Sequence, residues 1–465
     1  MSMVWVAQIL TMGMQLVYAG VTSRAIGPAG FGSFAVALAA TGLGGILASS
    51  GLANAAARRT GDDISGDRAI VTAAALAGLL VALVFALGAP LWARLWGNPD
   101  ATPLIRALCI GLAVGSYGGV LAGIARRLGR IGIWTAATFA SSVVAMLLGG
   151  WATYATREAW SLTVMPVALS VISSTILLVA MGRRGIPTRR LGTVGHDIAY
   201  GAKSLGSSLL TYIAYGLPMW SMSRWLGAST LGSWNRAAVV GQIPLESASR
   251  AAVTVIFPKF RWDRAGGDRV RRRWSALMAT SAIVVLPLTA LVVPAVPTVT
   301  RIILGSQWAE AGLMAQFILI ATAVNVLNAL LGSALEASNN FRAVWMSQIA
   351  VIATLTVACV LMLVTGRWVA VAGGYVIAAL VSQAVQVVWS SRGQLLSSRS
   401  ILLGYTAAAT LSLIMLGIAS AIVALASSDV VLIGMLVLVA VSALLALFAL
   451  RNHIEPLAVL VGGHE

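Results

Sequence analysis

The stretch Ser23-Arg-Ala-Ile-Gly-Pro-Ala-Gly-Phe-Gly-Ser33 follows the first long apolar run of the chain, and Ser223-Arg-Trp-Leu-Gly-Ala-Ser-Thr-Leu-Gly-Ser233 follows a later one. Both read Ser-Arg-x-x-Gly-x-x-x-x-Gly-Ser, and the pair Ile26 and Leu226 keeps the same register. Each copy follows about twenty apolar residues and places an arginine at a membrane boundary, so the repeat predicts two similar halves. Halves of this kind are typical of transporters with a site between them.

The composition assigns the chain to a broad class. Of its 465 residues, 59% are hydrophobic and only 10% are charged, and the mean hydropathy is +0.91. A chain with so little polar surface cannot cover one or more soluble domains, so the composition predicts an integral membrane protein.

Apolar runs long enough to cross a bilayer recur along the whole chain. A helix needs about 20 apolar residues to span the hydrocarbon, and these runs lack the alternation of barrel strands. The predicted fold class is therefore all-α, with about 14 transmembrane helices near residues 3–23, 31–54, 69–92, 104–124, 131–153, 160–181, 204–223, 231–256, 275–298, 313–335, 344–364, 368–390, 401–425 and 430–450. We expect the first run to be a helix and not a cleaved signal peptide, because it has little charge at its start.

Basic residues gather in the segments that follow even-numbered spans, and Arg58/Arg59 and Arg126/Arg127 are examples. Segments rich in Lys and Arg stay in the cytoplasm, so this bias predicts that both termini are cytoplasmic. The formal charge of +17 is then mainly a topology signal. Attraction to anionic membrane lipids is its expected secondary role, and nucleic acid is not implied.

Groups that carry metal or enzyme chemistry are sparse. Cys109 and Cys359 lie inside apolar runs without ligand spacing, and the histidines flank spans or lie in the tail, so we predict no metal and no cofactor. The predicted outer loops are short and hold only scattered acidic residues. A membrane glycan polymerase or ligase, which needs catalytic groups in such a loop, is therefore the weaker alternative, and no enzymatic activity is predicted.

Charged residues inside apolar runs are candidate site residues, because each costs at least about 2.5 kcal/mol to insert. Glu246 and Arg250 lie four residues apart, on one predicted helical face with Gln242, in the favourable order for an ion pair. The pair either neutralises itself so that the helix can pack, or lines a hydrated cavity. In the second case Arg250 exchanges Glu246 for an anionic substrate.

Three further arginines stand near the predicted outer surface. Arg24 and Arg224 end the first and seventh spans, and Arg236 lies about one turn into the eighth. They either extend toward the outer headgroups or line a cavity, where guanidinium groups match the oxygens of a diphosphate. The predicted substrate-binding residues are Arg24, Arg224, Arg236 and Arg250, with Glu246 and Gln242 as the cavity ion pair or ion-coupling group.

The repeat also carries a family resemblance. Thr22-Ser-Arg-Ala-Ile-Gly-Pro-Ala-Gly-Phe-Gly32 resembles the signature at the end of the first helix of polysaccharide transporters. The stretch Leu226-Gly-Ala-Ser-Thr-Leu-Gly-Ser-Trp-Asn-Arg-Ala237, followed by Gln242-Ile-Pro244 and Val255-Ile-Phe-Pro258, is similar to the pattern of Wzx-type flippases. These flippases belong to the multidrug/oligosaccharidyl-lipid/polysaccharide exporter superfamily.

The resemblance implies two six-helix lobes around a central cavity. It divides the chain into an N-terminal lobe at 1–200, a C-terminal lobe at 201–391 and a helix pair with a short tail at 392–465. It implies flipping of an undecaprenyl-diphosphate-linked oligosaccharide across the bacterial cytoplasmic membrane, driven by an ion gradient without ATP. Other polysaccharide assembly proteins are expected partners.

A multidrug/cation antiporter of the same superfamily is the main rival. That class needs carboxylates buried in its lobes, and the first six predicted spans contain no Asp or Glu. Asp67 and the other acidic residues of this half fall in predicted loops. In the second half only Glu246 and Glu336 are candidates, and Glu336 lies near the inner end of the tenth span.

Overall fold

The computed structural model describes residues 2–59, 63–188, 195–242, 245, 267–338, 340–393 and 395–449. Within these ranges the chain is helical and contains no strand. Each predicted span overlaps a helix, and among the described residues ten helical runs are long and apolar enough to cross a membrane. The all-α membrane fold class is therefore confirmed.

The chain forms two compact units. Unit 1 comprises Met1–Arg236 and Ile303–Gln307, and unit 2 comprises Ala237–Ile302 and Trp308–Glu465. Unit 1 extends beyond the predicted lobe boundary at residue 200 because α8 (Gly195–Ser221) packs on α3 (Gly51–Arg58). The lobes 1–200 and 201–391 and the helix pair 392–465 stay predictions.

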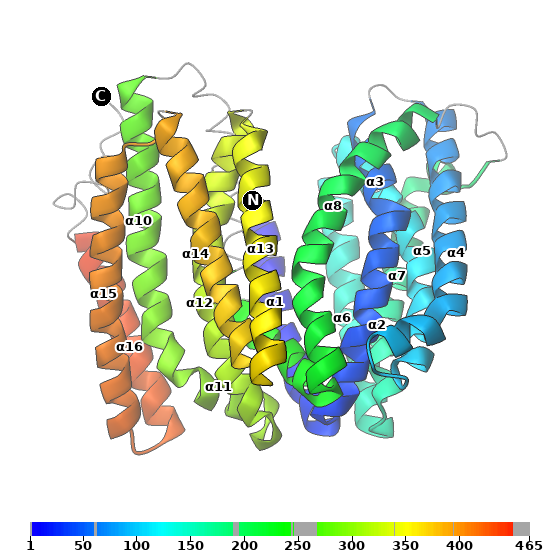
Figure 1. Ribbon diagram of the computed structural model, residues 1–465. Coiled ribbons are helices and arrows are strands. Elements are labelled where there is room, and N and C mark those ends of the chain that lie inside the picture. Colours follow the sequence, from blue (N-terminus) through cyan, green and yellow to red (C-terminus); the bar gives the residue numbers. More distant parts are fainter. Residues whose placement is uncertain are drawn as a thin grey trace. The chain divides into compact units, whose positions relative to one another are not determined.

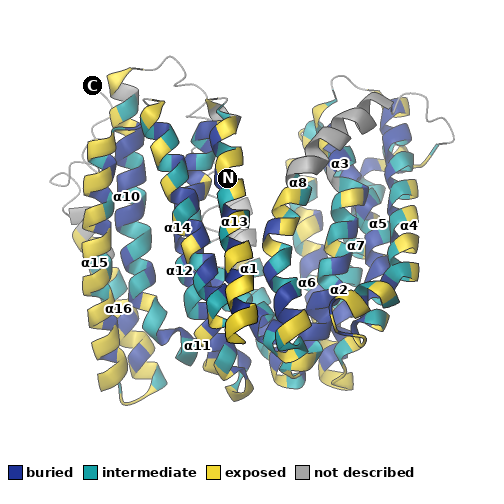
Figure 2. Cartoon of the chain, viewed as in Figure 1, coloured by how far each residue is buried: buried dark blue, intermediate teal, exposed yellow. Residues whose placement is uncertain are grey.

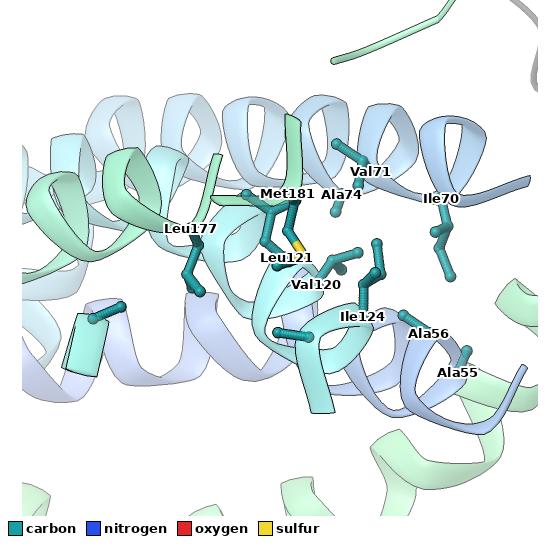
Figure 3. Packing of buried hydrophobic residues seen from close by; sticks show 12 residues of the cluster. Ala55, Ala56, Ile70, Val71, Ala74, Val120, Leu121, Ile124, Leu177 and Met181 are labelled. Atoms are coloured by element: carbon teal, nitrogen blue, oxygen red, sulfur yellow. The ribbon is translucent and has the colours of Figure 1, made fainter. Parts of the chain in front are cut away.

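Unit 1 is a bundle with α5 (Ala101–Arg127) at its centre (Figure 1). Helix α5 packs most extensively against α2 (Pro28–Gly45), α3, α4 (Ile64–Leu95) and α7 (Val164–Met181). The remaining long helices of this unit are α1 (Ser2–Ala25) and α6 (Ile131–Thr156), and residues 228–236 are also helical. Figure 3 shows part of the core, formed by fully buried side chains that include Ile70, Val71, Val120, Leu121, Ile124 and Leu177.

Unit 2 contains the longer helices of the second half. In it α10 (Asp268–Val292) packs along α15 (Ser398–Leu425), and α12 (Ala309–Ala337) packs on α14 (Val369–Arg392). The other helices are α11 (Val296–Leu304), α13 (Phe341–Thr365), which packs on α14, and α16 (Asp429–Ala449).

Helix α4 shows how the chain adapts to lipid. Its buried face consists mainly of small residues, including Ala74, Gly78, Ala82, Ala89 and Ala93. Its exposed face consists of large apolar residues at helical spacing: Leu76, Leu79, Leu80, Leu83, Leu87 and Leu91. Small residues let membrane helices approach closely while leucines face the lipid tails. Helix α15 also has a broad exposed side with large apolar residues (Figure 2).

A buried ion-pair cluster joins three segments of unit 1. Asp67, in the first turn of α4, is fully buried. Nη2 of Arg127 donates to both Asp67 oxygens, at 2.8 and 2.7 Å, and Nη1 of Arg184 donates to Oδ2 at 3.0 Å. The expectation that Asp67 lies in a loop is wrong, because α4 begins five residues before the apolar run. These arginines therefore do more than set topology.

Removing the carboxylate of Asp67 leaves two guanidinium groups without their shared partner. We expect Asp67→Asn to destabilise the protein by about 3–5 kcal/mol, the cost of breaking a buried pair. Thermal and denaturant unfolding of the purified protein measures the change.

Asp429 offers a matched control. It accepts from Nη2 of Arg301 through both oxygens, at 2.9 and 3.1 Å, but this pair is largely exposed. Asp429→Asn should cost less than about 1 kcal/mol. Equal effects of the two substitutions would contradict a special role for the buried cluster.

Candidate functional site

The two repeat copies meet at the start of α2 and of the helix over residues 228–242. A Cβ atom on Gly32 would overlap the carbonyl oxygen of Ala228, and a Cβ atom on Gly232 would overlap that of Pro28. Positions 32 and 232 are equivalent in the repeat, and so are 28 and 228. The contact is therefore reciprocal, as a local two-fold relation between the copies requires. We call it the repeat crossing.

The second copy is held by the turn that joins α4 to α5. Oγ of Ser223 donates to the carbonyl oxygen of Trp96 at 2.9 Å. Gly97 has a φ of +67°, and a Cβ placed there would lie 3.3 Å from Cδ of Arg224. The aliphatic part of Arg224 thus packs on this turn.

The first copy is held in a similar way by the turn between α11 and α12. Nε2 of Gln307 donates to the carbonyl oxygen of Ser23. Gly305 has a φ of +107°, and a Cβ placed there would lie 3.5 Å from Cγ of Arg24. Each copy is therefore fastened by a glycine turn that is distant in sequence.

The predicted site residues have different environments. Arg24 and Arg224 are exposed, whereas Arg236 is buried. Gln242 is half-buried and belongs to unit 2. Glu246 and Arg250 lie outside the described residues, so the predicted ion pair and the grouping of all four arginines stay predictions.

Arg236 is enclosed by neutral groups. Its Cζ lies 4.1 Å from the centre of the Phe31 ring, and Nη2 donates to Oδ1 of Asn235 at 2.9 Å. Among the described residues, none of the ion pairs includes Arg236, and its Nε has no hydrogen-bond partner. A buried guanidinium without a carboxylate is costly, and the aromatic face offsets only part of that cost.

Asn235 connects Arg236 to a pocket in unit 1. The pocket has a volume of about 630 Å³ and opens between α2 and α8. It is lined by Ala35, Leu38, Ala39, Ile46, Ser208, Thr211, Tyr212, Tyr215, Gly216, Met219 and Asn235. The Tyr212 hydroxyl donates to the carbonyl oxygen of Ala39 at 2.8 Å, which fixes the ring at the wall.

A second pocket of about 280 Å³ lies between α2, α5 and α7. It shares Leu38 with the larger pocket and presents Thr41, Ser49, Ser116 and Ser170. The residues that line these two pockets are all neutral. Sequence reasoning looked for charge and so missed the hydroxyl, phenol and amide groups of both walls, which apolar runs conceal.

Comparison with known proteins identifies the family. The sequence model of a protein family described as "Polysaccharide biosynthesis protein" matches residues 21–313. The chain belongs to this family. The predicted resemblance to polysaccharide transporters is thereby confirmed.

One relative of this chain is the succinoglycan biosynthesis transport protein ExoT of Rhizobium meliloti (strain 1021). The two are 33% identical over 113 residues, which is 23% of this chain and 22% of that protein. The matched segment is therefore a small part of the relative.

Solved structures match over most of the chain. Lipid II flippase MurJ in an inward closed conformation gives a TM-score of 0.77 at 11% identity, over 98% of this chain and all of that one. An inward-facing multidrug resistance MATE family transporter gives 0.56 at 14% identity, over 87% and 98%. At such identities these matches establish a shared fold.

The repeat crossing predicts that two equivalent glycines cannot be enlarged. We expect Gly32→Ala and Gly232→Ala each to cost about 3 kcal/mol or more, because the added methyl would overlap backbone. Thermal unfolding and protein yield measure the effect.

Gly27→Ala is the control for this prediction. Gly27 has a φ of −76°, and a Cβ placed there meets no atom within 4 Å. This variant should be close to wild type. A Gly232→Ala protein as stable as Gly27→Ala would show that the crossing is not tightly packed.

Proposed function

We propose that this protein flips an undecaprenyl-diphosphate-linked oligosaccharide across the bacterial cytoplasmic membrane by alternating access, using an ion gradient. Membership of a polysaccharide biosynthesis family and a flippase fold support a transporter of lipid-linked glycan. The relative's role in succinoglycan transport agrees with an exopolysaccharide repeat unit as cargo. Both termini lie in the cytoplasm in this proposal.

The observation that carries the proposal is a neutral pocket, mainly apolar with several hydroxyl groups, beside a buried cation. Tyr212 and Tyr215 contribute aromatic rings to the wall, and Ser208, Thr211 and Asn235 contribute polar groups. This combination suits a sugar, which has apolar faces and a rim of hydroxyls. Since Oδ1 of Asn235 accepts from Arg236, the amide offers its Nδ2 donor to a ligand.

The arginines serve the diphosphate in this mechanism. Arg236 raises the potential beside the pocket, and Arg24, Arg224 and Arg250 bind the headgroup as it enters or leaves. Guanidinium groups replace the water that a diphosphate gives up. Glu246 and Gln242 take part in ion coupling. The polyprenyl tail stays in lipid while the head crosses.

The drug-antiporter alternative has less support. A cationic drug requires a carboxylate in its pocket, and neither pocket described above has an acidic lining residue. Glu336 is exposed near the end of α12. The neutral walls favour a glycan over a cation.

Transport in liposomes tests the proposal. A fluorescent polyprenyl-diphosphate oligosaccharide is placed in the outer leaflet, and its loss of accessibility is followed with time. We expect Arg236→Gln to slow translocation at least about tenfold, because losing the positive charge beside the pocket removes more than about 1.4 kcal/mol of attraction for the diphosphate. The Arg24→Ala/Arg224→Ala double variant should also be slow.

Arg301→Gln is the matched control, because Arg301 forms an exposed ion pair and does not line the pocket. It should transport at the wild-type rate. Wild-type rates for Arg236→Gln and for the double variant would show that these arginines do not form the substrate-binding site. No translocation of any lipid-linked glycan under proton or sodium gradients, with export of a cationic dye instead, would replace the function with drug antiport.

A further inference from the structure

A cluster of buried neutral amides lies between α12 and α14 of unit 2. Gln383 and Gln386 of α14 are each 5% exposed, and Asn328 of α12 is 9% exposed. All three lie inside helical runs that are long and apolar enough to cross a membrane. Polar groups at such depth must find partners within the protein.

The amino groups of these amides have partners. Nδ2 of Asn328 donates to Oδ1 of Asn325 and to the carbonyl oxygen of Ala379, both at 3.1 Å. Nε2 of Gln383 donates to the hydroxyl of Tyr405 at 2.6 Å. Nε2 of Gln386 lies 3.5 Å from Oγ of its neighbour on α14, Ser382.

The oxygens of the same amides have none. Oδ1 of Asn328, Oε1 of Gln383 and Oε1 of Gln386 are buried, and no hydrogen-bond donor in the described part of the chain reaches them. Oγ of Ser390, one turn beyond Gln386, is likewise buried without a hydrogen-bond partner among the described residues. The imbalance has one sign, because all the unmatched amide atoms are acceptors. Buried acceptors left in this way are costly, so they favour a cation or a hydrogen-bond donor as a partner.

The helix contacts bring these oxygens to one interface. The hydrogen bond from Asn328 reaches Ala379, which is one turn before Gln383 on α14. A Cβ placed on Gly332, one turn after Asn328 on α12, would lie 3.8 Å from Oε1 of Gln386. The two glutamines thus border Asn328 and Gly332 within about one helical turn, or roughly 6 Å.

We propose that the amide oxygens of Asn328, Gln383 and Gln386 form a binding site for a sodium ion. Oxygen-only ligands select hard cations. Because these ligands are neutral, they compensate a single charge in a low dielectric far better than a double one. The burial of the three side chains excludes a ligand as large as a sugar.

The proposal rests on the transport function proposed above and adds the identity of the coupling ion. Binding itself can be measured without transport. A sodium site that is present while no glycan moves would count against the proposed function alone, and glycan transport without sodium binding would count against this site alone.

Thermal unfolding of the full-length protein in detergent tests the site. The chloride salts of sodium, potassium and N-methylglucamine are compared at equal ionic strength, and binding of radioactive sodium is measured in parallel. A ligand that binds only the folded state raises the melting temperature with saturation. We expect a saturable rise in sodium over N-methylglucamine, together with stoichiometric sodium binding.

Substitutions at Gln386 separate binding from packing. Gln386→Met keeps the shape and loses only the 3.5 Å contact, and it should abolish the sodium-dependent rise. Gln386→Glu should retain it, because a carboxylate supplies the same oxygen. Gln316→Met is the control in α12, since the Gln316 amide donates to Val293 instead, and it should respond to sodium as wild type does.

Two outcomes would overturn the proposal. Equal melting temperatures of the wild-type protein in the three salts, without sodium binding, would mean that water satisfies the amide oxygens. If the sodium-dependent rise in melting temperature is unchanged in Gln386→Met, the sodium ion binds at another place in the protein.

Discussion

The close backbone contact at the repeat crossing constrains everything built around it in unit 1. Two helices can approach so closely only where neither has a side chain, so glycine is required at both position 32 and position 232. This close approach also places the Phe31 ring over Arg236, with 4.1 Å between the ring centre and Cζ of the arginine. Asn235, next to Arg236, is placed at the wall of the larger pocket. The repeat that makes the crossing is therefore also the scaffold of the candidate site.

The turns that fasten the two copies explain the serine of the second copy through its side chain, whereas the first copy uses the backbone at this position. Ser223 is buried and bonds to the turn at Trp96, while the backbone of Ser23 accepts from Gln307. The arginine stems then pack on Gly97 and Gly305, and both arginines are exposed residues. The phrase thus joins a fixed backbone to a cation at the surface. Fixing the stem lowers the conformational entropy lost when the head group binds an anion.

The helices and the family could be predicted from the sequence, because about twenty apolar residues in a row and a repeated phrase are local signals. The contacts of Ser223 with Trp96 and of Gln307 with Ser23 could not, since the partners lie far apart and no periodicity links them. Asp67 was misplaced because hydropathy marks the apolar part of a helix and not its first turn. The candidate site was predicted least well. Charges are conspicuous in apolar runs, whereas Tyr212, Asn235 and Gln386 carry no charge and give no comparable signal.

The two units differ in the polar groups that they bury, and this difference bears on coupling. Unit 1 buries Arg236 beside a neutral pocket, which favours an anionic, sugar-bearing ligand. Unit 2 buries amide oxygens, which favour a cation. An antiporter in which one carboxylate binds either ion or substrate couples the two by direct competition. Here the proposed ligands have opposite charge and use different residues, so they do not compete for a group. Coupling between them must then arise from the conformational states that each ligand favours, because a ligand shifts an equilibrium only by its difference in affinity between those states.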